Sequence, residues 1–111
     1  MNIPITTAEE LFWEDLEITI VFKNILKDDK FNELEDLIMS WYTLGVNYGF
    51  QGTLHNMSKV WIEDNEVGFT VDMGSVEVEI CLGILFASIE GFSKVNNIEV
   101  QNIILGNSEG L

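Results

Sequence analysis

Hydrophobic residues recur with a period of two over residues 16–23. The residues at every second position are large and apolar: Leu16, Ile18, Ile20 and Phe22. Glu17 and Thr19 lie between them and face the other side of an extended chain. Because successive side chains of a β-strand point to opposite faces, this period of two predicts a strand with one buried face.

A helical spacing begins after Asp28 and Asp29, either of which can cap a helix. Apolar residues then recur every three or four positions: Leu34, Leu37, Ile38, Trp41 and Leu44. This is the spacing of one face of an α-helix. Several glycines follow from Gly45 onward and make continuation costly. The pattern therefore predicts a helix that ends at about Asn47.

Two further strands are expected in the middle of the chain. Residues 53–62 read as one strand, and Val67, Phe69 and Val71 alternate with smaller or polar residues in the next. The four residues from Glu63 to Glu66 separate them and are rich in turn formers. The pattern predicts a hairpin with a four-residue loop.

The segment after Gly74 is compatible with two structures. Alternation over residues 76–80 fits a strand, whereas Ser75 is a good helix N-cap. Apolar residues at helical spacing favour a helix from Val76 to about Val95: Val78, Leu82, Leu85, Ile89 and Phe92. Two internal glycines, Gly83 and Gly91, either weaken this helix or allow it to approach a sheet closely.

The ends of the chain complete the order of elements. Thr7-Ala8-Glu9-Glu10 matches the capping-box pattern and predicts a short N-terminal helix that ends at Asp15. Residues 98–105 are expected to form the last strand. The result is one α+β domain over residues 1–111, with a ferredoxin-like βαββαβ sandwich as the expected fold. In that fold two helices cover one face of a four-stranded antiparallel sheet.

Charge limits what this domain binds. Nineteen acidic residues face five lysines and no arginine, for a formal net charge of −14. Apolar residues make up 47% of the chain, so the acidity belongs to a folded domain and not to a disordered one. The negative electrostatic field of such a domain repels phosphate backbones and anionic membranes, and it favours a basic protein partner. The alternative is that the acidity only keeps the domain soluble.

Catalytic and metal-binding patterns are weak. Cys81 and His55 are the only residues of their kinds, and they are far apart in the chain. Cys81 lies between apolar neighbours, which predicts a buried structural thiol. The acids from Glu63 to Glu66 lack the register of a calcium loop. We therefore expect a binding protein with no cofactor, no metal and no enzymatic activity. The N-terminus lacks the pattern of a signal peptide, which predicts a cytoplasmic location.

The sheet face away from the helices is the expected binding surface. Glu17, Thr19, Thr70 and Asp72 would lie on it if Val67, Phe69 and Val71 face the helices. Trp61 would join them if Val60 and Ile62 are buried; otherwise it belongs to the core. An aromatic side chain among carboxylates is typical of a binding hot spot. The predicted partner-binding residues are Glu63, Asp64, Glu66, Asp72 and Trp61.

Short motifs in the C-terminal half resemble those of a known class of proteins. A strand ends in Val71-Asp72-Met73-Gly74-Ser75, an apolar helix follows, and the closing strand ends in Ile103-Ile104-Leu105-Gly106. Small bacterial immunity proteins of polymorphic and contact-dependent growth inhibition systems look similar. The resemblance implies a cytoplasmic inhibitor that binds one cognate toxin domain, often a nuclease.

Two other functions are compatible with the sequence. A ferredoxin-like ligand-sensing or regulatory domain would act as a homodimer and bind a small molecule. An enzyme would need an ordered pocket that contains His55.

Overall fold

Two helices and a five-stranded mixed sheet make up the α+β fold of this chain. The structure, a computed structural model, describes residues 3–108. The elements follow in the order β1 (Ile5–Thr7), the 3-10 helix η1 (Trp13–Asp15), β2 (Leu16–Phe22), α1 (Asp28–Val46), β3 (Trp61–Glu63), β4 (Glu66–Val71), α2 (Val78–Asn96) and β5 (Val100–Asn107).

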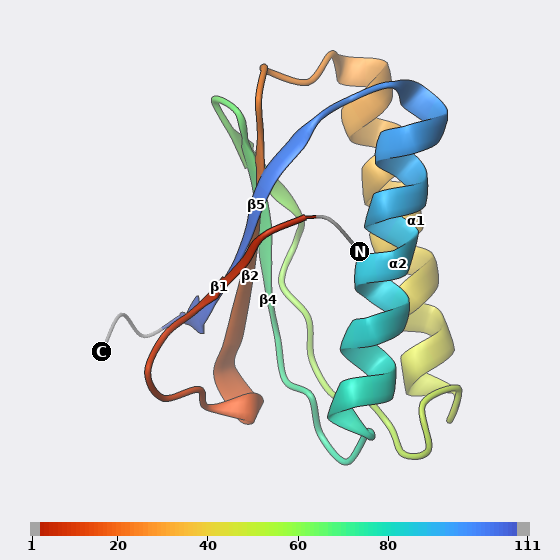
Figure 1. Cartoon of the computed structure of the whole chain (residues 1–111). Helices are drawn as coiled ribbons and strands as arrows, with labels where there is room; N and C mark the ends of the chain where they lie inside the picture. Colours follow the sequence, from red (N-terminus) through yellow and green to blue (C-terminus); the bar gives the residue numbers. More distant parts are fainter. Residues whose placement is uncertain (1–2, 109–111) are drawn as a thin grey trace.

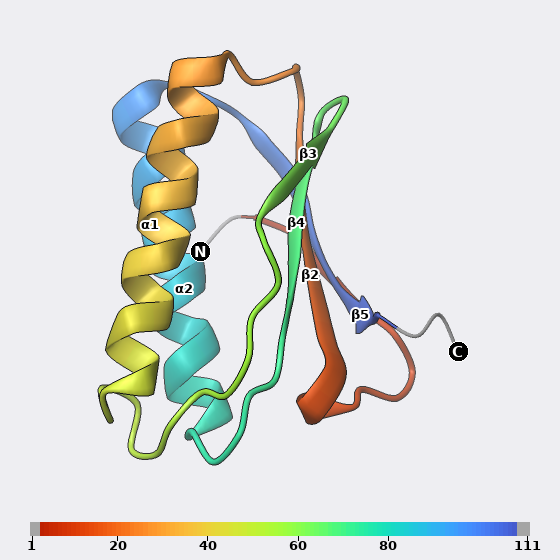
Figure 2. The ribbon, with the colours of Figure 1, turned by 180° about the vertical axis from the view of Figure 1, so that it is seen from behind.

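The sheet has the strand order β1-β5-β2-β4-β3. β2 runs antiparallel to both of its neighbours, β4 and β5, and β3 runs antiparallel to β4. β1 runs parallel to β5 at the edge. Both α-helices cover the same face of the sheet and run in opposite directions (Figure 1, Figure 2). In the part of the chain that the structure describes, neither α-helix lies on the other face of the sheet.

The core lies between the sheet and the two helices. The four alternating apolar residues of β2 are all fully buried, which confirms the predicted strand. Trp41 of α1 packs against Phe69 of β4, with their ring centroids 5.9 Å apart. Its indole Nε1 donates a hydrogen bond of 2.9 Å to the backbone oxygen of Cys81 in α2. A single tryptophan therefore joins α1, α2 and the sheet.

The predicted N-terminal helix is wrong. Thr7 ends strand β1, and the next residue, Ala8, donates its backbone N–H to the Leu105 oxygen at 2.9 Å. Helical structure in this region is limited to η1 at Trp13–Asp15. The capping-box residues therefore lie in an edge strand and the loop after it, where β5 supplies hydrogen-bond partners that a local pattern does not show. This strand makes the sheet five-stranded and mixed, in place of the four-stranded antiparallel sheet that we expected.

The strand predicted over residues 53–62 is mostly irregular. Only Trp61–Glu63 forms β3, and Met57 makes an isolated bridge to Val71. At Ser58 the side-chain Oγ accepts the hydrogen bond of the Thr70 N–H at 2.9 Å. A serine hydroxyl that takes the place of a backbone carbonyl interrupts a regular ladder.

The hairpin between β3 and β4 has a shorter loop than we predicted. Glu63 pairs directly with Glu66, so the loop contains two residues. Asp64 adopts a left-handed φ of 53°, which suits an Asp in a tight turn. Asn65 anchors the turn to the end of β2, since its Nδ2 donates to the Phe22 oxygen at 2.7 Å.

The ambiguous segment after Gly74 is helical from Val78 onward. Its N-cap is Glu77, whose Oε1 accepts the Glu79 N–H at 3.3 Å, and not Ser75. Ser75 Oγ instead accepts the backbone N–H of Thr53 at 3.1 Å. Within the helix, a Cβ atom added to Gly83 would meet no other atom within 4 Å, so this glycine does not serve close packing against the sheet. Over residues 3–108, neither helix combines the length and apolar character that crossing a membrane requires.

Candidate functional site

The sheet face without α-helices is the most distinctive surface of the fold. We call it the open face. It comprises the strand residues that alternate with the buried ones: Thr6, Glu17, Thr19, Val21, Trp61, Glu63, Glu66, Gly68, Thr70, Asn102, Ile104 and Gly106. Figures 1 and 2 show both helices on the opposite side of the sheet.

An apolar row crosses the middle of the open face. The register places Ile104 of β5 beside Thr19 of β2, Thr19 beside Gly68 of β4, and Gly68 beside Trp61 of β3. Thr19 is only 8% exposed although no helix covers it. Ile104, its direct neighbour in the row, is 36% exposed. The row thus has two large apolar side chains, Ile104 and Trp61, with the small residues Thr19 and Gly68 between them.

Trp61 is held in place by a glycine. A Cβ atom on Gly68 would lie 2.2 Å from Cζ2 and 2.7 Å from Cε2 of Trp61. The indole therefore lies directly against the backbone of β4, in the space that any other residue would fill. Close approach to a backbone is a common reason for glycine inside a strand. Gly68 fixes the position of the aromatic ring on the open face.

Three carboxylates surround the apolar row. Glu17 lies beside Thr70, while Glu63 and Glu66 lie directly opposite each other at the end of the hairpin. None of the five strands in the described part of the chain contains a lysine or arginine. Among residues 3–108, the ion pairs found do not include these three glutamates. Like charges opposite each other in a sheet are destabilising, so the pair of Glu63 and Glu66 lowers stability in the free protein.

Four of the five predicted partner-binding residues lie close together. Trp61, Glu63 and Glu66 share the open face, and Asp64 forms the tip of the adjoining turn. Asp72 lies beyond the opposite end of β4. The rise of about 3.3 Å per residue in a strand puts it roughly 20 Å from Glu66.

Asp72 has local structural partners. Its Oδ1 accepts the backbone N–H of Gly74 at 2.9 Å, and its Oδ2 lies 3.4 Å from Nδ1 of His55. Gly74 has a φ of +55°, and a Cβ there would lie 2.2 Å from the Thr53 oxygen. Asp72 therefore stabilises a tight turn that only glycine fits.

Ile104 and Thr6 are open-face residues that the sequence interpretation missed. Thr6 comes from β1, a strand that we did not predict, and Asn102 Nδ2 donates to its Oγ1 at 3.1 Å. Ile104 had a usable signal, because it follows Ile103 directly. Adjacent residues of a strand point to opposite faces, so two neighbouring isoleucines put one of them on the open face.

Cys81 and His55 do not form a catalytic pair. Cys81 is buried, and burial raises the pKa of its thiol to about 12. The side chain of His55 is 57% exposed and lies beside Asp72. Within residues 3–108, no three His, Cys, Asp or Glu side chains are grouped so that they could hold a metal ion.

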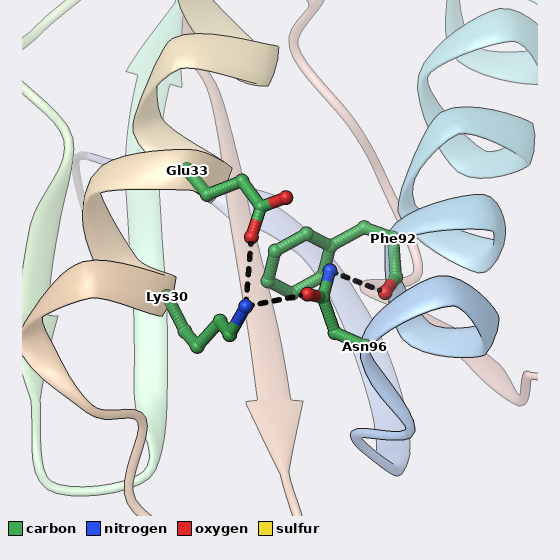
Figure 3. A network of polar contacts seen from close by, with 4 residues as sticks. All are labelled: Lys30, Glu33, Phe92 and Asn96. Carbon is green, nitrogen blue, oxygen red and sulfur yellow. Dashed lines mark hydrogen bonds and ion pairs between the residues drawn. The ribbon is translucent and has the colours of Figure 1, made fainter.

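Lys30 belongs to the helix layer and not to the open face. Its Nζ donates to Asn96 Oδ1 at 2.7 Å and lies 3.4 Å from Glu33 Oε2 (Figure 3). Asn96 Nδ2 in turn donates to the backbone oxygen of Phe92 at 3.0 Å. This network joins the start of α1 to the end of α2. Lys30 is therefore paired within the helix layer, on the side of the sheet away from the open-face acids.

No protein-family model, no curated protein and no solved structure matches this chain. The geometry of the surface and the chemistry of its residues are therefore the basis for the functional argument.

Proposed function

We propose that this chain is an immunity protein that binds and neutralises a cognate basic toxin domain, of the nuclease type, in the cytoplasm. It acts by stoichiometric protein–protein inhibition and not by catalysis. The observation that carries the proposal is the open face, where Trp61 and Ile104 flank a flat row and Glu17, Glu63 and Glu66 surround it.

The chemistry of this face suits a basic partner. Nuclease active sites carry cationic side chains that hold phosphates, and carboxylates can occupy the same cations. The net charge of −14 speeds encounter with such a surface and rejects acidic partners. A large aromatic side chain within the contact slows dissociation, because buried aromatic anchors supply most of the binding energy in protein interfaces.

We also propose that the fold is a ferredoxin-like unit extended by one strand. In support, the strands β5-β2-β4-β3 are antiparallel throughout and two helices cover one of their faces. The additional strand β1 lies at the β5 edge. It widens the open face on the side of Ile104 and takes that edge of β5 out of contact with solvent.

The test is protection of growing cells. Where the gene beside that of this chain encodes a large secreted protein, the chain is co-expressed with the C-terminal domain of that protein, and growth is recorded. We expect rescue by the wild-type chain. Purified proteins should associate with 1:1 stoichiometry in calorimetry, and affinity should fall as the salt concentration rises from about 50 to 300 mM.

Two variants identify the surface. Trp61→Ala should weaken binding by about 30-fold or more, the loss typical of a central aromatic anchor. The triple variant Glu17→Gln, Glu63→Gln and Glu66→Gln should mainly slow association, by about tenfold. A matched control removes three carboxylates from α1 instead: Glu33→Gln, Glu35→Gln and Asp36→Asn. If the control weakens binding as much as the open-face variant does, net charge alone drives association and the proposed surface is wrong. Absence of any protection would reject the function itself.

A further inference from the structure

A cleft lies where β2 leads into α1 and α2 leads into β5. Figures 1 and 2 show both connections at the same end of the fold. One wall of the cleft consists of residues 24–27 together with Lys30, and the other wall consists of residues 96–99. The volume of the cleft is about 250 Å³. Typical small-molecule sites have roughly 300–1,000 Å³, so a ligand of this cleft has to be small.

Hydrogen bonds join the two walls at both ends of the cleft. At one end, the backbone N–H of Lys23 donates to the Glu99 oxygen at 3.0 Å. At the other end, Lys30 Nζ donates to Asn96 Oδ1 at 2.7 Å (Figure 3). Leu26, between these two bonds on the first wall, is buried and belongs to the core. The cleft is therefore formed in the free protein and does not need a ligand to shape it.

Two opposite charges in the cleft are left without a protein partner. Lys30 is paired, because Glu33 Oε2 lies 3.4 Å from its Nζ. Among residues 3–108, the side chains of Lys27 and Glu99 form no ion pair or hydrogen bond with the protein. Lys27 belongs to one wall and Glu99 to the other. The free charged groups of the cleft are thus one ammonium and one carboxylate, on opposite walls.

Amide groups and isoleucines complete the lining. The carboxamides of Asn24 and Asn97 line the cleft, and within the described part of the chain they have no hydrogen-bond partner. Ile25 is large and apolar but 69% exposed, and Ile98 on the other wall is partly buried against the core. Apolar walls with a few polar groups that fix the orientation of a ligand are the usual composition of a small-molecule site.

The balance of charge selects the class of ligand. The net charge of the chain is −14, so the protein as a whole repels a free anion. A cation is attracted by the whole protein, but inside the cleft it meets Lys27 and Lys30. A zwitterion has no net charge to be repelled, and its two charged groups match the two free groups of the cleft. An α-amino acid with an apolar side chain combines these properties in a small molecule.

We propose that the cleft binds a free α-amino acid with a branched apolar side chain of about the size of leucine. Lys27 and Asn24, on one wall, bind its carboxylate. Glu99, on the other wall, binds its ammonium group, and the side chain of the ligand packs on Ile25 and Ile98. The inference is independent of the proposed function, because it uses no residue of the open face.

The size and the charge of the ligand set the expected affinity. A small ligand with two charged contacts in a solvent-accessible cleft should bind with a dissociation constant of about 0.1–1 mM. Because the ligand is neutral overall, a rise in salt concentration should weaken its binding by less than about twofold. The salt dependence expected for a basic protein on the open face is much steeper.

Titration of the isotope-labelled full chain with L-leucine at pH 7, followed by two-dimensional NMR, tests the proposal. We expect saturable shifts of the backbone amide signals of residues 24–27 and 96–99, while the signals of β3 and β4 stay unchanged. Two analogues keep the apolar body: 4-methylpentanoate lacks the ammonium group, and 3-methylbutylamine lacks the carboxylate. Each analogue should bind at least about tenfold more weakly than leucine, because it leaves one charged group of the cleft unpaired.

Variants with matched controls locate the site. Lys27→Gln should weaken leucine binding at least about fivefold. Lys59→Gln removes the same charge from an exposed position outside the cleft and should leave binding unchanged. Glu99→Gln and its control Glu63→Gln should differ in the same way. All four side chains are exposed, so the variants should fold.

Three results would each overturn the proposal. The first is the absence of saturable shifts up to about 20 mM leucine. The second is an affinity for either analogue equal to that for leucine. The third is an equal loss of binding in Lys27→Gln and Lys59→Gln, or in Glu99→Gln and Glu63→Gln, because net charge and not the cleft would then control the interaction.

Discussion

Replacement of Gly68 by alanine tests whether the indole of Trp61 lies against Gly68 on the open face. The added Cβ would lie 2.2 Å from Trp61 Cζ2, so the indole has to swing away from the sheet. A tryptophan buries about 150–250 Å² when it is packed. If about 100 Å² of that contact with the sheet is lost, the cost at 25 cal/mol per Å² is about 2.5 kcal/mol. Replacing a strand glycine by alanine returns about 0.5–1 kcal/mol of backbone entropy. The net loss in the free energy of unfolding should be about 1.5–2 kcal/mol.

The same change should have the opposite sign when the indole is absent. In a Trp61→Ala background nothing occupies the space above Gly68, so Gly68→Ala should raise the free energy of unfolding by about 0.5–1 kcal/mol. The coupling between the two positions is then about 2.5 kcal/mol, measured in a double-mutant cycle. Urea denaturation followed by far-UV circular dichroism at low micromolar concentration gives the four stabilities. Equal effects of Gly68→Ala in both backgrounds would show that the indole does not lie on Gly68.

Three further predictions concern positions away from the open face: Gly52, Gly83 and Cys81. Gly52→Ala should destabilise the fold by about 2 kcal/mol or more, because Gly52 has a φ of +146° and a Cβ there would lie 2.1 Å from the Ser75 oxygen. Gly83 has open space around it, so Gly83→Ala should stabilise α2 by up to about 1 kcal/mol in the same urea assay. A reversal of either sign would refute the corresponding local account. Burial raises the pKa of the Cys81 thiol from its ordinary 9.0 to about 12, so the folded state keeps the proton that the unfolded state loses. The contribution of this thiol to stability is complete below pH 9 and is lost as the pH rises toward 12. The wild type should therefore lose stability over this range relative to Cys81→Ala. In the folded protein Cys81 should not react with Ellman's reagent at pH 8. A thiol that reacts rapidly in the folded protein would contradict its burial.

The long elements could be predicted from the sequence because each has a single buried face. β2 keeps a period of two over its whole length, and α1 and α2 keep helical spacing over nineteen residues each. Burial of one face imposes such a pattern on the chain itself, independent of what packs against it. Val67, Phe69 and Val71 are accordingly buried. Of the helical set in α1, Leu34, Ile38 and Trp41 are buried, whereas Leu37 is partly buried and Leu44 is exposed.

The short edge strand β1 could not be predicted in this way. Strand β1 has three residues, all exposed, and therefore carries no pattern of burial. It forms because residues nearly a hundred positions later provide partners: Ile103 N–H donates to the Pro4 oxygen at 2.9 Å, and Ala8 N–H to the Leu105 oxygen. The capping-box pattern at Thr7 is a local preference, and these distant hydrogen bonds override it.

The chemical character of the candidate site was already present in the sequence. The excess of acids over lysines, the lack of arginine and the presence of Trp61 beside Glu63 and Glu66 all follow from the order of the residues. Charge and composition do not depend on the fold, and for that reason the sign of the partner's charge is a prediction from sequence.

Only the tertiary structure decided where these groups lie. Strand register puts Trp61 opposite Gly68 and on the open face; a shift of one residue would have turned the indole toward the helices. The same register brings Ile104 into the row and leaves Asp72 at the far end of β4, bound to its own turn. A surface is formed by hydrogen-bonded neighbours that are distant in the chain, and no local pattern contains that information.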